Sequence, residues 1–414
     1  PPRTLSVGGI IRAVYSSSNG LEKRPKLRFP GFDEPYKQCH IGDIYAERSQ
    51  RGASDMELLS VTMNDGVMPR SEIEGKDNSS EDKSNYKVVL TGDMVYNSMR
   101  MWQGANGISP CNGIVSPAYT VLMPKIPISN GYFAAFFKSP NLINEFRKNS
   151  QGMTSDTWNL KYPQIETIKV CIPALSEQNR VADMLGTLER RIAKQAHLVD
   201  CLKKYKRGLI SEILNQKIRI THEDEKWEEV SLSAVADGFE YGMNAAATIF
   251  DGVHKYIRIT DIDDDSHTYI DSAPVSPAGV LEGKYRVREN DILFARTGAS
   301  VGKSYLYQAS DGDMYFAGFL IRIHVIDGVD SGYVFLNTLT EEYNRWVALE
   351  STRSGQPGIN AEQYRRYRFK LPPLETQKQI SAIAQKIDAQ IKRESQCLRL
   401  LQKQKDGFLQ QLFI

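Results

Sequence analysis

The sequence lacks long apolar runs and the usual signatures of metal or disulfide sites. Its 414 residues contain no apolar stretch of the roughly 18 residues that a transmembrane helix needs. The five cysteines include no C-x-x-C pair and the six histidines are scattered. A zinc site, a disulfide framework and a Ser-His-Asp site are therefore not indicated. The first residues lack a charged region followed by a long apolar core, so we expect no secretory signal and a cytoplasmic protein.

Charge is balanced overall but uneven along the chain. There are 52 Lys and Arg against 50 Asp and Glu, a net charge of +2. Residues 176–220 hold ten basic against five acidic side chains, and residues 364–370 (YRRYRFK) alternate basic with aromatic. A charge run is as often a solvated face as a binding surface, so these segments permit a polyanionic partner without requiring one.

One long segment occurs twice. Residues 172–214 and 371–413 align without a gap at an offset of 199 residues. Identical or similar residues recur at matched positions, as in Pro173 and Pro372, Leu175 and Leu374, Gln178 and Gln377, Ile192 and Ile391, Leu202 and Leu401, and Gly208 and Gly407. Such a duplication indicates two structural units of one design.

Both copies carry an apolar repeat of 3.5 residues. Walking alternately four and three residues from Val181, or from Ile380, meets mostly apolar side chains, the pattern of a coiled-coil seam. The seam is broken at the same two steps in both copies, by Gln195 and Lys206 in the first and by Glu394 and Lys405 in the second. We expect two helices of about 39 residues, each about 58 Å long.

Two arrangements of these helices are compatible with the repeat. Each could lie along the core of its own domain, although an ordinary core helix is shorter and has a wider apolar stripe. The narrow repeat favours pairing of the two helices with each other. Antiparallel pairing would relate the two halves by a pseudo-twofold axis.

The segments before the two helices also correspond. Each half has a short strand after an aromatic residue, an acidic turn that leads into a strand, a further strand, an amphipathic helix, a polar Gly-containing loop and a last strand. The amphipathic helix is expected at residues 132–148 in the first half and 333–350 in the second. Many short strands with few helices are typical of an α+β domain.

The predicted fold is α+β. Two domains of mixed α/β structure are each followed by a long helix, and the two helices pair as an antiparallel coiled coil with an internal pseudo-twofold repeat. The predicted boundaries are an N-terminal extension at 1–26, a first domain at 27–172, a long helix at 173–215, a linker at 216–226, a second domain at 227–371 and a long helix at 372–414.

Three patterns imitate catalytic motifs. Residues 298–304 (GASVGKS) resemble a P-loop but have three residues between the glycines where four are needed, and a strand is expected to follow. The segments 74–76 and 282–284 (both EGK) fit the end of a nuclease E-x-K motif, with Asp65 or Asp271 upstream, a pattern that arises easily by chance. Residues 261–265 (DIDDD) are more typical of an acidic surface turn than of a cation site. A Gly-rich turn that brings Lys303 and backbone amides near a phosphate is the better interpretation of the first pattern.

Several short segments recur in a fixed order along the chain. They are the helix starts IPALSEQ and LPPLETQ, residues 27–32 (LRFPGF), the turns at Gly92-Asp93 and 290–294 (NDILF), residues 296–298 (RTG) with Gly302-Lys303, residues 357–360 (PGIN), and the helix ends KRGLISEIL and KDGFLQQLF. In this order and duplication the chain, from about Leu27 to Ile414, resembles the specificity subunit of type I restriction-modification enzymes. The first half departs most, with residues 158–160 (WNL) in place of the PGIN pattern and residues 100–104 (RMWQG) in place of the RTG pattern.

The resemblance implies a non-catalytic DNA-recognition subunit. Each globular domain would be a target recognition domain that reads one half of a bipartite double-stranded DNA site. The helix pair would set the spacing and dock two methyltransferase subunits, and restriction and translocase subunits would join the full complex. S-adenosylmethionine, ATP and Mg²⁺ would act on these partners, with no cofactor or metal in this chain, whose sequence has no Asn-Pro-Pro-Tyr or Asp-Pro-Pro-Tyr motif.

Candidate DNA contacts follow from side-chain chemistry. Arg reads guanine bidentately and Gln or Asn reads adenine, while Lys and Ser mainly hold phosphates. Loops on a rigid scaffold usually carry recognition. The candidates in the second half are Arg296, Thr297, Lys303, Ser304, Arg353, Ser354 and Gln356. Those in the first half are Arg100, Gln103, Asn106, Gln151, Thr154 and Asn159.

A different class of function is also compatible with the sequence. The chain could be a coiled-coil scaffold whose two globules bind acidic proteins instead of DNA. A DNA shift assay with and without a cognate methyltransferase, at two salt concentrations, would discriminate between the two hypotheses.

Overall fold

The computed structural model describes residues 12–13, 25–51, 55–63, 66–75, 77, 79–154, 157–220, 225–352 and 357–413. The chain divides into two compact units, the first built from Pro1–His197 with Gln396–Ile414 and the second from Leu198–Ser395. In each unit a mixed α/β globule is joined to one stretch of each long helix, so the predicted α+β fold is confirmed. Within the described residues, no helix has the length and apolar character needed to cross a membrane.

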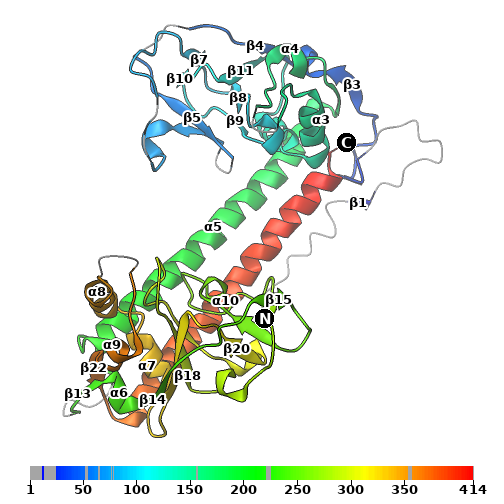
Figure 1. Ribbon diagram of the computed structural model, residues 1–414. Helices are drawn as coiled ribbons and strands as arrows, with labels where there is room; N and C mark the ends of the chain where they lie inside the picture. Colours follow the sequence, from blue (N-terminus) through cyan, green and yellow to red (C-terminus); the bar gives the residue numbers. More distant parts are fainter. Residues whose placement is uncertain are drawn as a thin grey trace. The chain divides into compact units, whose positions relative to one another are not determined.

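The first unit is made of short strands and short helices that precede one long helix (Figure 1). Its strands are β1 (Arg12–Ala13), β2 (Leu27–Arg28), β3 (Lys37–His40), β4 (Tyr45–Glu47), β5 (Leu59–Thr62), β6 (Gly66–Pro69), β7 (Lys87–Val89), β8 (Met94–Asn97), β9 (Asn106–Ile108), β10 (Gly113–Val115), β11 (Tyr119–Pro124) and β12 (Lys169–Ile172). Its helices are α1 (Ile41–Ile44), η2 (Arg70–Glu72), η3 (Met101–Gln103), α2 (Asn130–Phe136), α3 (Pro140–Asn149), α4 (Tyr162–Ile165) and the beginning of α5 (Leu175–Leu214).

The second unit has the same main elements in a similar order. Its strands are β13 (Glu228–Ser231), β14 (Ala236–Tyr241), β15 (Ala247–Ile249), β16 (Lys255–Ile257), β17 (Val275–Pro277), β18 (Asp291–Ala295), β19 (Ser304–Leu306), β20 (Met314–Phe316), β21 (Leu320–Val325) and β22 (Arg368–Leu371). Its helices are α6 (Leu232–Val235), η4 (Ile259–Asp261), η5 (Gly283–Tyr285), η6 (Ala309–Asp311), α7 (Ser331–Asn337), α8 (Glu341–Glu350), α9 (Ala361–Arg365) and the beginning of α10 (Leu374–Gln411).

Both units contain the same four-stranded antiparallel sheet. The strand order is β4-β11-β8-β9 in the first unit and β14-β21-β18-β19 in the second. All five residues of β18 are buried, which is why the four residues after Asp291 are a continuous apolar run and not an alternating one. The smaller strand pairs differ, since β7 and β10 are antiparallel whereas β16 and β20 are parallel.

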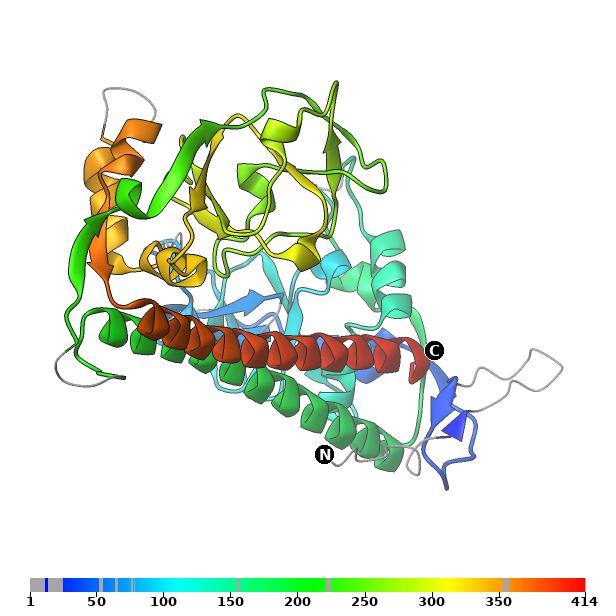
Figure 2. The same ribbon diagram turned by 90° about the horizontal axis from the view of Figure 1, so that it is seen from below.

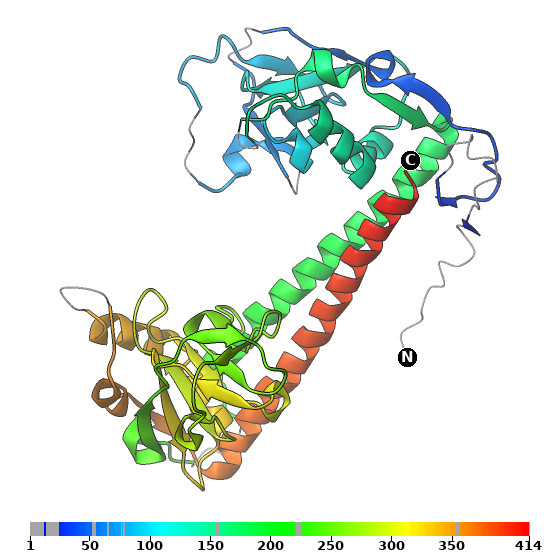
Figure 3. The ribbon, with the colours of Figure 1, turned by 45° about the vertical axis from the view of Figure 1, so that its right-hand side comes forward.

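A second strand pair joins the beginning of each globule to its end. In the first unit β3 lies beside β12 just before the chain enters α5 (Figure 3). In the second unit β13 lies beside β22 just before the chain enters α10 (Figure 2). Each long helix therefore starts from a strand that is held by main-chain hydrogen bonds.

The acidic turns before β8 and β18 have the same geometry. Gly92 and Asn290 occupy the left-handed region, with φ of 92° and 67°, a conformation that glycine adopts freely and that asparagine tolerates better than most residues. The carboxylates of Asp93 and Asp291 each accept a hydrogen bond of 2.9 Å from the backbone amide three residues earlier. The sequences Gly92-Asp93 and Asn290-Asp291 therefore form the same turn in the two units.

The single amphipathic helix predicted in each half is wrong, because each half has two short helices there. In the first unit Pro140 begins α3, since proline has no amide hydrogen and clashes with a preceding helical turn. In the second unit the hydroxyl of Thr340 accepts a hydrogen bond of 3.1 Å from the amide of Tyr343 and caps the start of α8.

The long helices α5 and α10 are continuous and have 40 and 38 residues, close to the predicted length. In the first unit Val181 and Leu185, near the start of α5, share a core with Leu409 and Leu412, near the end of α10. In the second unit the end of α5 and the start of α10 share a core in the same way. The predicted antiparallel pairing is therefore confirmed.

The two lysines that break the apolar seam form ion pairs between the helices. In the second unit the Nζ of Lys206 lies 2.7 Å from the carboxylate of Asp388, and in the first unit the Nζ of Lys405 lies 2.7 Å from that of Glu189. Both the lysines and the acids are equivalent positions in the duplicated segment. A lysine stem can pack along a seam while its ammonium group reaches the edge, and each partly exposed pair contributes up to about 1 kcal/mol.

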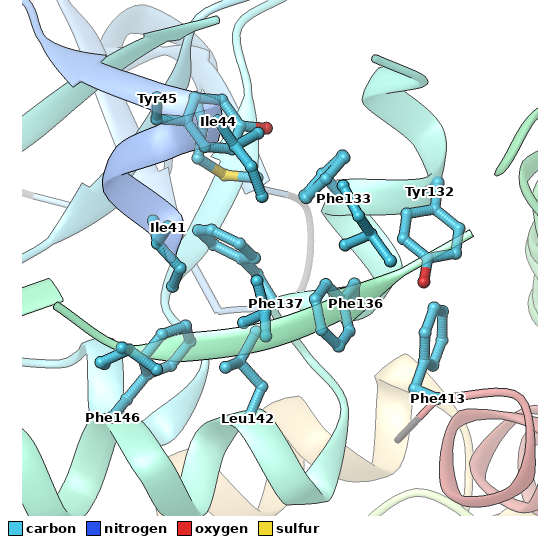
Figure 4. Close-up of a cluster of buried hydrophobic side chains, with 14 of the residues drawn as sticks. Ile41, Ile44, Tyr45, Tyr132, Phe133, Phe136, Phe137, Leu142, Phe146 and Phe413 are labelled. Carbon is cyan, nitrogen blue, oxygen red and sulfur yellow. The ribbon is translucent and has the colours of Figure 1, made fainter. Parts of the chain in front are cut away.

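The core of the first unit is rich in aromatic side chains (Figure 4). Tyr132, Phe133 and Phe136 of α2 pack there with Phe413, which follows α10. The Phe413 ring centroid lies 5.2 Å from that of Tyr132 and 5.4 Å from that of Phe136. Truncating a buried phenylalanine to alanine typically costs about 3–5 kcal/mol, so the last residues of the chain contribute strongly to this globule.

A buried glutamine fastens each long helix to its globule. The side-chain oxygen of Gln178 accepts a hydrogen bond of 3.1 Å from the amide of Ser129, and its nitrogen donates one of 2.9 Å to the carbonyl of Pro173. Gln377 makes the same two bonds in the second unit, at 2.9 Å to an amide and 2.7 Å to the proline carbonyl. Both side chains are buried, which explains the shared Gln in the two helix starts.

We expect Gln178→Ala and Gln377→Ala each to lower the free energy of unfolding by about 1–3 kcal/mol, because each leaves a buried amide and carbonyl without partners. Denaturant unfolding followed by circular dichroism measures the change. Gln402→Ala is the matched control, because Gln402 lies on the exposed face of α10, and it should change stability by less than about 0.5 kcal/mol. Equal stability of all three variants would contradict the fastening role.

Candidate nucleic-acid interface

In the second unit, two loops from distant parts of the chain, one after β18 and one after α8, lie against each other. Arg296 comes directly after β18, and its carbonyl accepts a hydrogen bond of 2.9 Å from the amide of Ile359. The amide of Gly298 donates one of 3.1 Å to the carbonyl of Pro357. Thr297 lies between these two bonds, so the RTG and PGIN segments form one continuous surface.

Arg296 is held against an aromatic ring on this surface. Its guanidinium carbon lies 4.8 Å from the centroid of the Tyr241 ring, a distance typical of a cation–π contact. The Tyr241 hydroxyl accepts a hydrogen bond of 3.3 Å from the amide of Ala361. The amide of Arg296 donates one of 3.1 Å to the carbonyl of Phe319, whose side chain is 60% exposed. We refer to Arg296, Tyr241 and Phe319 as the Arg296 cluster.

Lys303 and Ser304 are engaged inside the unit. The ammonium group of Lys303 donates a hydrogen bond of 2.9 Å to the carbonyl of Ile262 and forms an ion pair with Asp264. Ser304 is fully buried, and its hydroxyl lies 2.7 Å from that of Thr338. A fully buried hydroxyl has no surface to offer another molecule, so Ser304 is left out of the proposed contact set, and Lys303 is left out because its charge is already neutralised.

The acidic turn at residues 261–265 acts as a counter-ion for neighbouring lysines. Besides the pair between Asp264 and Lys303, the carboxylate of Asp265 lies 3.3 Å from the Nζ of Lys203 on α5. Across the described part of the chain, no group of three or more His, Cys, Asp or Glu is arranged to hold a metal ion.

Of the remaining motifs, the P-loop-like segment can be assessed in the structure, whereas several other residues lie outside the described part of the chain. After the P-loop-like segment the chain forms β19, a strand and not the helix that a P-loop requires. Outside the described residues lie the candidates Arg353, Ser354 and Gln356, together with Asp65 and Lys76 of the nuclease-like pattern.

In the first unit an aromatic pair gathers the predicted residues. Arg100 directly precedes the short helix η3, and Gln103 is its last residue. Trp102 between them packs edge-on against Trp158, with ring centroids 5.3 Å apart. The guanidinium carbon of Arg147 on α3 lies 5.6 Å from the Trp158 ring. Base–aromatic stacking is sequence-tolerant, whereas Arg and Gln can discriminate bases, so this patch contains side chains suited to both kinds of contact.

The loop that carries Trp158 brings three more predicted residues to the same place. Gln151 and Asn159 pair across its base through two backbone hydrogen bonds of 3.0 and 2.8 Å. Thr154 is exposed near the tip, where its amide donates a hydrogen bond of 3.1 Å to the hydroxyl of Thr157. The structure therefore joins Gln151, Thr154 and Asn159 to the residues around η3.

Asn106 does not belong to this patch. It is fully buried, and its side-chain nitrogen donates hydrogen bonds of 3.2 Å to the carbonyl of Gly104 and 3.3 Å to that of Phe137. These bonds fix the turn after η3 against α2, so Asn106 is left out of the proposed contact set.

The predicted correspondence between Arg100 and Arg296 is wrong. The carbonyl of Ser98 accepts a hydrogen bond of 2.9 Å from the amide of Leu160, just as that of Arg296 does from Ile359. The Ser98 amide also donates to the carbonyl of Ala118, at 3.3 Å, as the Arg296 amide does to Phe319. Ser98 therefore occupies the position of Arg296, and Arg100 lies two residues further on.

Sequence reasoning missed the aromatic members of both patches. Trp102 and Trp158 are adjacent to predicted residues, and an aromatic beside Arg, Gln or Asn in a polar loop was a signal that could have found them. Tyr241 and Phe319 carried no comparable signal, because only the folded sheet shows that these rings stay exposed.

Comparisons with known proteins show a similarity to type I specificity subunits. The family model for the type I restriction modification DNA specificity domain matches residues 224–402. The specificity subunit of the type I restriction enzyme StySPI from Salmonella potsdam is 26% identical over 276 residues, 63% of this chain. That of EcoKI from Escherichia coli is 22% identical over 283 residues, also 63% of this chain. Residues 224–402 therefore resemble a type I restriction modification DNA specificity domain, and the chain is similar to type I specificity subunits. The matches span 58% and 59% of the lengths of these two family members.

Solved structures share the fold. The S subunit of a type I restriction-modification system from M. genitalium superposes with a TM-score of 0.58 at 12% identity, covering 95% of this chain and 99% of that one. A chain from a study of assembly and conformational transition of the type I R-M system gives a TM-score of 0.57 at 14% identity, covering 91% and 97%.

A half-buried histidine contacts the start of β19, the strand that follows the Arg296 cluster. The Nδ1 of His267 lies 2.9 Å from the carbonyl of Ser304, a distance at which a protonated Nδ1 donates a hydrogen bond. Burial lowers the pKa of His267 below its ordinary value, with the positive charge of Lys303 acting in the same direction. The folded unit therefore binds a proton at this site less readily than the unfolded chain.

This difference predicts a loss of stability in mild acid. As the pH falls through about 6.5, the unfolded imidazole takes up a proton that the folded one resists, so stability decreases until the lower folded pKa is reached. We expect His267→Gln to reduce the loss of unfolding free energy between about pH 7.5 and about pH 5.5. Replacing the exposed His197 by Gln is the control. The same pH dependence in wild type and His267→Gln would contradict a half-buried neutral imidazole.

Proposed function

We propose that this chain is the DNA-recognition subunit of a type I restriction-modification complex, each globular unit reading one half of a bipartite double-stranded DNA target. The observation that carries the proposal is the duplicated sheet, which presents a patch of basic and aromatic loop side chains in each unit. The match of residues 224–402 to the type I restriction modification DNA specificity domain, and the similarity to known specificity subunits, support it.

The two patches suit different parts of recognition. Arg100, Gln103 and Arg296 carry the hydrogen-bond donors that distinguish base edges in the major groove, and Trp158 and Phe319 add apolar surface beside them. The net charge is only +2, so general attraction to the phosphate backbone is weak. Much of the DNA affinity is therefore expected to come from partner subunits.

The long helices are proposed to dock two methyltransferase subunits. Tyr205 and Leu198 are 58% and 42% exposed, and they lie seven residues apart on one face of α5. Leu400 on α10 is 60% exposed. Large apolar side chains exposed on otherwise polar helices are typical of a protein-contact surface. Restriction and translocase subunits would join the same complex.

The chemistry is proposed to lie on the partners. Methyl transfer from S-adenosylmethionine and ATP- and Mg²⁺-dependent steps would belong to the methyltransferase and restriction subunits, in a cytoplasmic complex. The chain itself would act by binding and positioning DNA. The scaffold alternative is not favoured, because the family match concerns a DNA specificity domain.

Exchanging the globular domain of the second unit tests the proposal directly. We expect that replacing residues 227–370 with those of a relative changes one half of the methylated DNA motif and leaves the other half unchanged, because each unit has its own sheet and patch. Methylation-sensitive sequencing of cells that express the chimera with its methyltransferase measures the motif. A motif that changes in both halves, or methylation that does not depend on this chain, would refute it.

The two continuous helices are proposed to set the spacing of the two half-sites. Inserting seven residues into each, after Gln195 and after Glu394, keeps the 3.5-residue repeat in phase. It adds about 10 Å of helix, or up to about three base pairs of DNA. We expect the same two half-sites separated by a longer spacer. An active complex with an unchanged spacer would exclude this role.

A further inference from the structure

The Arg296 cluster has no counterpart at the matched position of the first unit. Equivalent backbone hydrogen bonds place Ser98 where the second unit has Arg296, and Ala118 where it has Phe319. The scaffold around the two positions is otherwise the same, because β8 and β11 pair as β18 and β21 do. The duplication has therefore kept the backbone at this point and replaced the side chains.

This difference bears on what Arg296 contacts. The DNA backbone is chemically the same in both half-sites, so a residue that only holds a phosphate is useful to both readers. Base edges differ between unlike half-sites, so residues that read them are expected to differ between the readers. The second unit has an arginine and a large exposed ring where the first unit has a serine and an alanine. This difference is the one expected of residues that read bases.

The state of the guanidinium supports the same conclusion. Lys303 is neutralised by Asp264, whereas the guanidinium of Arg296 has no ion-pair or hydrogen-bond partner in the part of the chain that the structure describes. Its Nε is buried and unpaired there, which leaves the two terminal amino groups to meet a ligand. The Tyr241 ring, 4.8 Å away, restricts the planar group, and a fixed pair of parallel N–H donors matches the O6 and N7 acceptors of guanine.

We propose that Arg296 reads a guanine in the half-site recognised by the second unit, and that Tyr241 is the positioning residue that holds its guanidinium flat. This inference rests on the proposed function. To that function it adds guanine as the base that is read, Arg296 as the residue that reads it, and Tyr241 as a residue that acts only through Arg296.

The test uses the full chain with its methyltransferase partner. Arg296→Lys keeps the positive charge but removes the planar pair of donors. Tyr241→Leu removes the ring, and Tyr241→Phe restores it. Arg345→Lys is the matched control, because Arg345 is an exposed arginine of the same unit that pairs with Glu342 on α8. Binding is measured on duplexes in which each base pair of the two half-sites is varied in turn, at two salt concentrations.

We expect Arg296→Lys to lose about 10- to 100-fold discrimination at a single G·C pair of the second half-site. The first half-site and the salt dependence should not change. Tyr241→Leu should lose about 2- to 10-fold discrimination at the same pair, and Tyr241→Phe should recover most of it. Arg345→Lys should behave as wild type.

Two results would overturn the inference while the proposed function stands. One is uniform weakening on all duplexes with a shallower salt dependence, which identifies Arg296 as a phosphate contact. The other is unchanged discrimination in Arg296→Lys. Failure of the wild-type complex to prefer any bipartite sequence would instead refute the proposed function itself.

Discussion

The fold depends on an exchange of helix ends. The core of the first globule includes Leu412 and Phe413, from the end of the chain, and the core of the second includes Ile213 and Leu214, from the end of α5. These two pairs are equivalent positions of the duplicated segment. Each globule is thus completed by the end of a helix that begins at the other globule. Neither globule is expected to keep its full stability when the opposite helix is cut, because several buried side chains would be lost together.

The two duplicated halves share the sheet, turns and helix starts that position the loops, and they differ in the loops themselves. The sheet order, the left-handed turn residue before β8 and β18, and the buried glutamine at each helix start recur in both units. The smaller strand pairs and the loop side chains differ. Buried positions are constrained by packing and hydrogen bonding, whereas an exposed loop side chain can change at little cost to stability. Such a division allows two readers on one scaffold to have different targets.

Charge on the surface is distributed less simply than the number of basic residues implies. Lys203 and Lys303 are held by the acidic turn at 261–265, and Lys206 and Lys405 are held across the helix pair. Arg296 and Arg147 instead lie over aromatic rings. A cation on a ring keeps most of its hydrogen-bonding capacity, whereas one paired with a carboxylate does not. These two arginines therefore remain more available to a polyanion than the four lysines do.

The sequence by itself determined the two long helices, their antiparallel pairing, four strands of each half and the resemblance to type I specificity subunits. These features rest on local periodicity and on a gapless internal repeat, which can be read along the chain. It also contained the break at Pro140, which sequence reasoning overlooked. Only the tertiary structure decided that Asn106 and Ser304 are buried, that Ser98 and not Arg100 matches Arg296, and that Tyr241 lies under Arg296. Those outcomes depend on contacts between segments far apart in the chain, and no local pattern specifies which side chains such contacts cover and which they leave exposed.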